Sequence, residues 1–235
     1  MQVESLEPWV NASHFAKDSI DSYSARFQQN DIRLLTINNF LMSSTLEKCS
    51  RFLCDHAHYE TMYGVFAKKQ KTTDKLSWSA LPEAERFFCY EMLSGSDHSD
   101  TINSDSLAFL KLRHFLGSMI FRQYVSRLTA MRLAEVTPIK VHRMYRGHFL
   151  KPHDDRSDGR LIAFILYLSP SWLPEYGGSL RIIKHGGSEV VVEPFFNRLL
   201  IFDVNRHKHH YIAEIFEQGR IARRNGRISI NGWFF

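Results

Sequence analysis

Lys151-Pro152-His153-Asp154-Asp155 is the stretch that decides the fold, because it sets an imidazole and a carboxylate two residues apart. In a β-strand, side chains at positions i and i+2 point to the same face. His153 and Asp155 would then project together, as a neutral nitrogen donor beside an anionic oxygen donor. A second histidine would complete the two imidazoles and one carboxylate that hold Fe(II) with open coordination positions. The stretch therefore predicts a strand that carries part of a metal site.

The second half of the chain has the pattern of many short strands. Apolar runs recur there, with turn residues such as Gly177-Gly178 and Asn225-Gly226 between them. The runs lie at residues 139–145, 161–168, 179–183, 189–192, 198–202, 211–216 and 228–235. Strands at this spacing are typical of a sandwich or barrel of the double-sheet jelly-roll type. We therefore expect a jelly-roll core from residue 138 onward.

The first half has mainly helical patterns. Ser44 and Glu47 have the spacing of a capping box ahead of apolar residues at helical intervals, and Pro82 suits a first helical turn. Apolar residues between 105 and 128 form one broad helical stripe. We expect helices over 43–58, 82–93 and 105–128, a short strand within 34–42, a strand and loop over 64–75, and a loop over 94–104.

The length and composition favour one domain. A chain of 235 residues with 44% hydrophobic residues can bury one sizeable core. Residues 1–30 show no sustained period and are expected to be an N-terminal arm. Residues 31–137 would be a mainly helical support for the catalytic core at 138–235, and no linker separates these two layers. The predicted fold class is α+β, a double-stranded β-helix (jelly-roll) core with supporting N-terminal helices.

Charge and cysteine content bound the partners and the compartment. No apolar run reaches the length of a membrane span, and the first 13 residues lack the plan of a signal peptide. The 3 cysteines have weak spacing, which favours a reducing compartment, so a cytoplasmic location is expected. The net charge of +5 would suit nucleic acid or an acidic partner, but solvated surface charge explains most of it.

Candidates for a third metal ligand crowd together in Arg206-His207-Lys208-His209-His210. The cluster follows a predicted strand, so it is well placed to face a ligand pair on a neighbouring strand. Its alternative role is a solvated basic turn, and one or two of the imidazoles are expected to have that role. The residues alone leave the choice among the three histidines open.

Arg227 and Ser229 share one strand face by the same i, i+2 rule. A guanidinium that points into a barrel needs an anion, because a buried unpaired charge is costly. Arginine presents a planar fork that matches a carboxylate, and a serine hydroxyl adds one donor. A small dicarboxylate is the predicted occupant, and a structural salt bridge with a buried acid is the alternative.

These features occur in one combination that resembles a known family. The motifs are Tyr145, Gly147, Leu150, His153 and Asp155, then Arg160-Leu161, Tyr167-Leu168-Ser169 with Trp172, Gly177-Gly178 with Leu180-Arg181, Glu193-Pro194 with Asn197-Arg198-Leu199, His210, and Arg227 and Ser229 with Gly232-Trp233-Phe234. Over about residues 138–235 the chain is similar to the prolyl-hydroxylase-like branch of the Fe(II)/2-oxoglutarate-dependent dioxygenases. The longer stretch before Arg227, rich in arginine over 217–226, departs from the family pattern.

The resemblance implies roles for the metal ligands. His153, Asp155 and a later histidine would bind Fe(II). His210, which alternating apolar positions follow, fits the family pattern best, and His209 is the alternative. Because Asp155 is present where related halogenases carry a small residue, halogenation is not expected.

The resemblance also implies a seat for 2-oxoglutarate. Arg227 would pair with its distal carboxylate, and Ser229 and the Tyr167 hydroxyl would be further donors. Tyr145 matches a family tyrosine on the strand that precedes His153, also near the co-substrate.

The implied activity is hydroxylation of an unactivated C–H bond of an amino-acyl group, with decarboxylation of 2-oxoglutarate to succinate. The implied cofactors are Fe(II), 2-oxoglutarate and O2, with ascorbate as a further candidate. The substrate would be a peptidyl or prolyl group of a peptide or protein, or a free or carrier-bound amino acid. Alternatives are a jelly-roll binding module without turnover and a nucleic-acid demethylase. The last is not expected, because the chain lacks interleaved aromatic and basic residues for base stacking; no oligomeric state is predicted.

Overall fold

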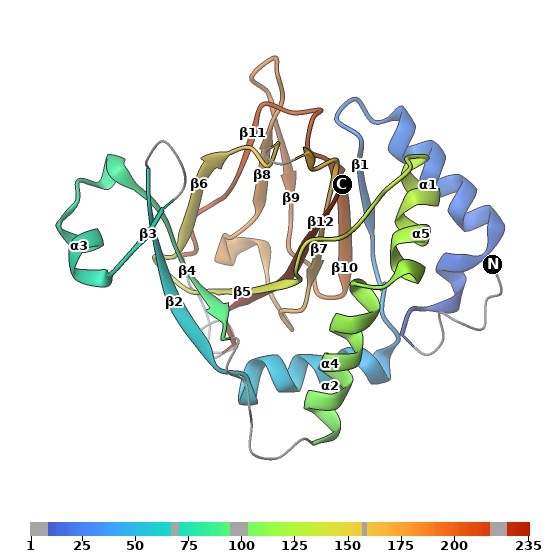
Figure 1. The fold of residues 1–235 in the computed structure, drawn as a ribbon, viewed down its shortest axis with the longest axis horizontal. Coiled ribbons are helices and arrows are strands. Elements are labelled where there is room, and N and C mark those ends of the chain that lie inside the picture. Colours follow the sequence, from blue (N-terminus) through green and yellow to red (C-terminus); the bar gives the residue numbers. More distant parts are fainter. Residues whose placement is uncertain (1–8, 67–70, 95–102, 157–158, 217–224) are drawn as a thin grey trace.

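The strands form one antiparallel sheet that curls on itself (Figure 1). The computed structural model describes residues 9–66, 71–94, 103–156, 159–216 and 225–235. In that part of the chain the 12-stranded sheet has the order β1-β10-β7-β12-β5-β4-β6-β11-β8-β9, and β2 pairs with both β3 and β4. The strands are β1 (Leu34–Ile37), β2 (Tyr59–Val65), β3 (Lys71–Thr73), β4 (Arg86–Leu93), β5 (Lys140–Met144), β6 (Phe149–His153), β7 (Ile162–Tyr167), β8 (Leu180–Ile183), β9 (Glu189–Val192), β10 (Arg198–Asp203), β11 (His209–Ile212) and β12 (Arg227–Phe234). Each apolar run of the second half overlaps one of these strands, as predicted.

Side chains alternate between two cores along the central strands. On β7, Phe164 and Leu166 pack into an outer core against the helices, while Ala163 and Tyr167 belong to the inside of the curled sheet. The same period of two operates on β12, whose Ile228, Ile230 and Phe234 face outward while Trp233 packs against the inner core. The inner face of β12 therefore carries the buried polar residues Arg227, Ser229 and Asn231.

Helices cover the outer face of the sheet (Figure 1). The helical elements are η2 (Ala12–Phe15), α1 (Lys17–Gln29), α2 (Ser43–Arg51), the π-helix η3 (Phe52–His56), α3 (Lys75–Ala80), η4 (Glu83–Glu85), α4 (Ser104–Leu116), α5 (Met119–Thr129) and η6 (Pro174–Tyr176). The ring of Phe121 on α5 lies 5.1 Å from that of Phe164 and 6.0 Å from that of Phe234. Aromatic contacts of this kind fix the helical layer to β7 and β12.

Residues 82–93, expected to be a helix, are mostly strand β4, so that expectation is wrong. Pro82 precedes only a short 3-10 turn. The residues that follow include Phe87 and Phe88, which suit a half-buried pleated surface, and β4 pairs with β2, β5 and β6. Tertiary pairing therefore decides this segment.

The single long helix expected over 105–128 is two helices, α4 and α5. Gly117 ends the first, and the Ser118 hydroxyl accepts a hydrogen bond from the Phe121 amide at 3.3 Å to begin the second. A capping box does occur, between Asn103 and Ser106 at the start of α4. None forms at Ser44, because α2 begins after Met42 with no side-chain cap.

The stretch expected to be an arm contains α1, whose Ile20 and Phe27 are buried in the outer core. The expected loop over 94–104 and the arginine-rich stretch over 217–226 lie mostly outside the described residues. No described helix has the length and apolar character that a membrane crossing requires.

Candidate functional site

Three of the predicted ligands come together at one end of β6. His210 on β11 lies directly across from His153, the last residue of β6, and Asp155 follows two residues later. The ligand atoms of the three side chains all lie within 4.8 Å of one another. Asp155 is placed by the turn after β6, not by the strand itself. His209, the alternative to His210, is not part of this cluster.

Short contacts join the three side chains. The Nε2 atom of His210 is 3.2 Å from Oδ2 of Asp155, and Nε2 of His153 is 3.8 Å from Oδ1. Trp233 Nε1–H donates a hydrogen bond of 2.8 Å to Asp155 Oδ2. The two oxygens of this carboxylate are therefore oriented by groups from β6, β11 and β12.

The protonation states of His153 and Asp155 favour metal binding. Burial lowers the pKa of His153 to about 4. Burial acts to raise the pKa of Asp155, but hydrogen bonds from His210 and Trp233 and the nearby imidazoles outweigh it and hold the pKa well below its usual range. Neutral imidazoles and an ionised carboxylate are the forms that ligate a metal.

His207 lies behind His210 and is fully buried, at 0% exposed. The two rings are joined by a hydrogen bond of 3.0 Å between His207 Nε2 and His210 Nδ1. In the metal-free site His210 Nε2–H donates to Asp155, whereas with a metal bound Nδ1–H would donate to His207 and free the Nε2 lone pair for the metal. The sequence did not distinguish this histidine from its neighbours, because its burial is a tertiary property.

His207→Leu is expected to lower Fe(II) affinity by about 10- to 100-fold, because His210 loses the partner that fixes its ring. His207→Gln offers an amide oxygen to His210 Nδ1–H and should retain most of the affinity. Metal titration of the apoprotein measures both. His209→Leu is the matched control and should bind as the parent does. Parental affinity of the His207→Leu protein would show that the hydrogen bond orients nothing.

Arg227, the first residue of β12, lies on the inside of the curled sheet and is 0% exposed. Its Nε–H donates to the Gly178 carbonyl at 2.6 Å, and its guanidinium carbon is 5.1 Å from the centre of the Tyr167 ring. Gly178 is needed there, because its φ is +72° and an added Cβ would lie 2.8 Å from the arginine Cδ. The backbone at Gly178 therefore packs directly against the Arg227 side chain.

Two polar atoms in this region have no hydrogen-bond partner within the described residues: Nη2 of Arg227 and the hydroxyl of Tyr167. Arg227 makes no ion pair within 4.0 Å among the described residues, although the Glu193 carboxylate raises its pKa from a longer distance and is the acid that the salt-bridge alternative would invoke. Burial lowers the pKa of Arg227 and raises that of Tyr167. Unpaired buried donors of this kind fit a bound carboxylate.

Ser229 is buried beside this pair, opposite Tyr167 in the sheet register. Tyr145 lies elsewhere: Arg143 is 5.3 Å from its ring centre, and the ring of His148 is 6.0 Å away. The residue that contacts the guanidinium is Met144, through its sulfur at 3.9 Å from Nη1 of Arg227. The role of Tyr145 near a co-substrate therefore stays a prediction.

A cavity of about 140 Å³ has all three candidate ligands in its wall, whereas Arg227, Ser229 and Tyr167 are not part of its lining. Its lining is Phe88, Tyr90, Lys140, His142, Leu150, His153, Asp155, Arg160, Ala163, Phe164, Ile165, Leu180, Phe202, His210, Ile212, Asn231 and Trp233. Apolar walls with a few convergent polar groups are typical of small-molecule sites.

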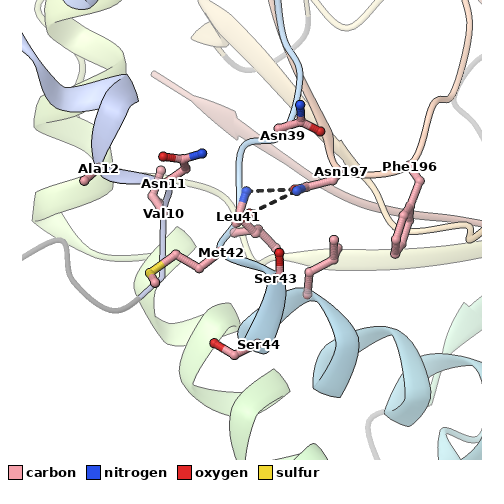
Figure 2. Close-up of a pocket in the computed structure, with 11 residues that line it drawn as sticks. Val10, Asn11, Ala12, Asn39, Leu41, Met42, Ser43, Ser44, Phe196 and Asn197 are labelled. Atoms are coloured by element: carbon pink, nitrogen blue, oxygen red, sulfur yellow. Dashed lines mark hydrogen bonds between the residues drawn. The ribbon is translucent and has the colours of Figure 1, made fainter.

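A larger pocket, of about 830 Å³, lies apart from the cavity, between η2, the start of α2 and the loop before β10. Figure 2 shows Asn197 in its wall, with its side-chain amide directed at the backbone of Leu41. Asn197 Oδ1 accepts from the Leu41 amide at 2.7 Å, and Nδ2 donates to the Leu41 carbonyl at 3.0 Å. Asn197 is thus satisfied by the protein, and the pocket holds none of the predicted site residues.

Comparison with known proteins gives the same family as the motifs. Residues 139–235 match the family described as the 2OG-Fe(II) oxygenase superfamily. The chain is 34% identical over 129 residues to the prolyl 3-hydroxylase OGFOD1 of Xenopus laevis, covering 52% of this chain and 24% of that protein. It is 33% identical over 91 residues to the prolyl hydroxylase EGLN3 of Mus musculus, covering 38% and 35%. The chain thus spans about a quarter to a third of the length of these relatives.

Solved structures share the fold. A prolyl hydroxylase from Trichoplax adhaerens, in complex with a peptide of the hypoxia inducible factor, superposes with a TM-score of 0.62 at 19% identity, over 92% of this chain and 88% of that one. A prolyl-4-hydroxylase from Pseudomonas putida gives a TM-score of 0.58 at 16% identity, over 92% and 97%. The predicted jelly-roll fold and the predicted resemblance are thereby confirmed: residues 139–235 match the 2OG-Fe(II) oxygenase superfamily, and the chain is similar to prolyl hydroxylases.

Proposed function

We propose that this protein is an Fe(II)- and 2-oxoglutarate-dependent hydroxylase that acts on an unactivated C–H bond of an amino-acyl group. One observation carries the proposal: a buried His153, Asp155 and His210 cluster and a buried, partly unpaired Arg227 occur inside the same curled sheet. A metal site alone would suit several classes of protein. A metal site with a separate carboxylate anchor suits a metal enzyme that uses a dicarboxylate co-substrate.

The donor set fits Fe(II). His153, Asp155 and His210 would hold the metal through two imidazole nitrogens and one carboxylate oxygen, which leaves positions open for other ligands. When bound, Fe(II) with 2-oxoglutarate and O2 supplies the oxidation, and the co-substrate leaves as succinate and CO2. The protein's part is to fix the position of the metal and its coordination geometry, and to hold the reacting groups inside the cavity. Ascorbate is proposed as a further cofactor.

The buried polar groups around Arg227 fit 2-oxoglutarate. The unpaired Nη2 of Arg227 and the unpaired Tyr167 hydroxyl would both donate to the distal carboxylate, with Ser229 beside them. A charge-assisted bond from a guanidinium is about twice as strong as a neutral one, so Arg227 would be the main anchor.

The proposed substrate is a prolyl residue of a peptide or protein. Prolyl hydroxylases are among the similar proteins, and the related Trichoplax structure holds a peptide. A free or carrier-bound amino acid is the second candidate of the same reaction class. A cytoplasmic location stays a prediction.

The test is to incubate the protein with Fe(II), 2-oxoglutarate, O2 and a library of proline-containing peptides, with and without ascorbate. We expect succinate release that depends on peptide, together with a mass gain of one oxygen on the peptide. A chelator should stop both. Binding of Fe(II) and 2-oxoglutarate without succinate under any condition would favour the alternative of a binding module. Oxygen gain on a free amino acid but on no peptide would reassign the substrate.

A further inference from the structure

His142 faces the cavity from β5, between the two halves of the proposed site. It lines the cavity with the candidate ligands, and it lies opposite Ser229 in the register of β5 and β12. Burial and Lys140 lower its pKa most, Arg227 also lowers it and Asp155 raises it, so the imidazole lies within electrostatic reach of both ends of the site. No role was assigned to this residue from the sequence.

The plane of the His142 ring is fixed by stacking. Tyr90 on β4 stacks on it with ring centres 4.5 Å apart and an angle of 30°. Phe88 stacks in turn on Tyr90, also with centres 4.5 Å apart. The stacked rings of Phe88 and Tyr90 hold the imidazole so that Nδ1 faces Asn231 on β12 and Nε2 remains available to a ligand.

The hydrogen bonds of Asn231 decide which ring nitrogen carries the proton. Its Nδ2 lies 3.3 Å from the Ser229 carbonyl oxygen, which can only accept, so the amide presents its NH2 group on this side. The same Nδ2 also lies 3.3 Å from Oγ of Ser229 and 3.3 Å from Nδ1 of His142, and the contact with an N–H donor assigns Nδ1 as an acceptor. Burial lowers the pKa of His142 to about 3, so the ring is neutral. The proton is therefore on Nε2.

This Nε2–H is a buried donor without a partner among the described residues. A buried N–H without an acceptor costs free energy. The Nε2–H of His142 is already oriented for an acceptor atom of a ligand that binds in the cavity. Two residues of an antiparallel strand advance about 6.8 Å, so His142 lies one such step from Met144, which contacts Arg227. A dicarboxylate that is anchored at Arg227 and chelates the metal would therefore extend past His142.

We propose that His142 is a co-substrate-binding residue whose Nε2–H donates a hydrogen bond to an oxygen of bound 2-oxoglutarate. The inference rests on the proposed function, because it needs the keto acid in the cavity. It goes beyond the anchor of Arg227, Ser229 and Tyr167 in adding a neutral donor from a different strand. The same donor could instead meet a carbonyl of the peptide substrate, and the test separates the two.

The experiment compares the parent, His142→Leu and His142→Gln proteins. Each is loaded with Fe(II) without oxygen and titrated with 2-oxoglutarate, with the visible absorption of the chelate as the signal. The leucine removes the donor, and the glutamine keeps an amide N–H near the position of Nε2. We expect a loss of about 10- to 100-fold in 2-oxoglutarate affinity for leucine and only a few-fold loss for glutamine. Affinity for Fe(II) alone should be unchanged in both.

Three results would overturn the inference while the parent still binds 2-oxoglutarate. Parental affinity in His142→Leu would show that the donor does not meet the co-substrate. Parental affinity together with a raised KM for a prolyl peptide would assign the donor to the substrate. Equal losses in the leucine and glutamine variants would reduce the role of His142 to packing against Tyr90. If the parent itself shows no Fe(II)-dependent binding of 2-oxoglutarate, the proposed function has failed first.

Discussion

Asp155→Ala is expected to abolish Fe(II)-dependent succinate release and to weaken Fe(II) binding by at least about 100-fold. Asp155 is the anionic member of the candidate ligand set, and its oxygens lie 3.2 Å from His210 and 3.8 Å from His153. Loss of a partner behind a ligand already costs about 10- to 100-fold, so loss of the ligand itself should cost more. Metal titration of the apoprotein and succinate assays measure the two effects separately.

Asp154→Ala is the matched control, one residue away. Asp154 is exposed and pairs at 3.3 Å with Arg156, a surface contact that contributes about 0–1 kcal/mol. Its removal should leave metal binding, turnover and the melting temperature close to parental. Succinate release by Asp155→Ala at near the parental rate would refute the assignment of the site, and a melting temperature far below that of the control would mean that the variant reports folding instead.

The strand pattern was predictable because it is local. A period of two along 162–167 and 227–234 puts apolar residues on the outer face and leaves Arg227 and Ser229 for the inner one. The pairing of His153 with a histidine of the 206–210 cluster also follows from the antiparallel register, because β6 and β11 are neighbouring strands. Family motifs, not spacing, favoured His210 over His209.

The errors arose where tertiary contacts override local pattern. Phe87 and Phe88 joined the sheet although Pro82 suggested a helix, and the break at Gly117 lies inside a continuous apolar stripe. His207 and His142 owe their importance to burial and to partners on other strands, which no spacing rule reveals. Met144 contacts Arg227, and Tyr145 lies near Arg143, so the role implied for Tyr145 by the family resemblance stays a prediction.

Arg227→Ala is expected to lower 2-oxoglutarate affinity by roughly 30- to 5,000-fold. Truncating one partner of a buried charge-assisted pair costs on the order of 2–5 kcal/mol, because the anion keeps its desolvation cost and loses its main partner. Arg227→Lys keeps the charge but loses the planar fork and the bond to Gly178, so it should be impaired as well. Ser229→Ala removes one neutral donor and should cost about 0.5–1.5 kcal/mol. Titration of the Fe(II)-loaded protein by chelate absorption measures all three.

Arg181→Ala is the control for the loss of positive charge, because Arg181 is partly exposed and pairs at 3.7 Å with Glu189 on the neighbouring strand β9. It should bind 2-oxoglutarate as the parent does. Addition of 2-oxoglutarate should raise the melting temperature of the Fe(II)-loaded parent and of Arg181→Ala, but much less that of Arg227→Ala, since a ligand stabilises only the fold that binds it. If Arg227→Ala binds as tightly as the parent, the buried guanidinium serves the fold alone, and Arg198, whose pKa burial also lowers, is the next candidate for the anchor.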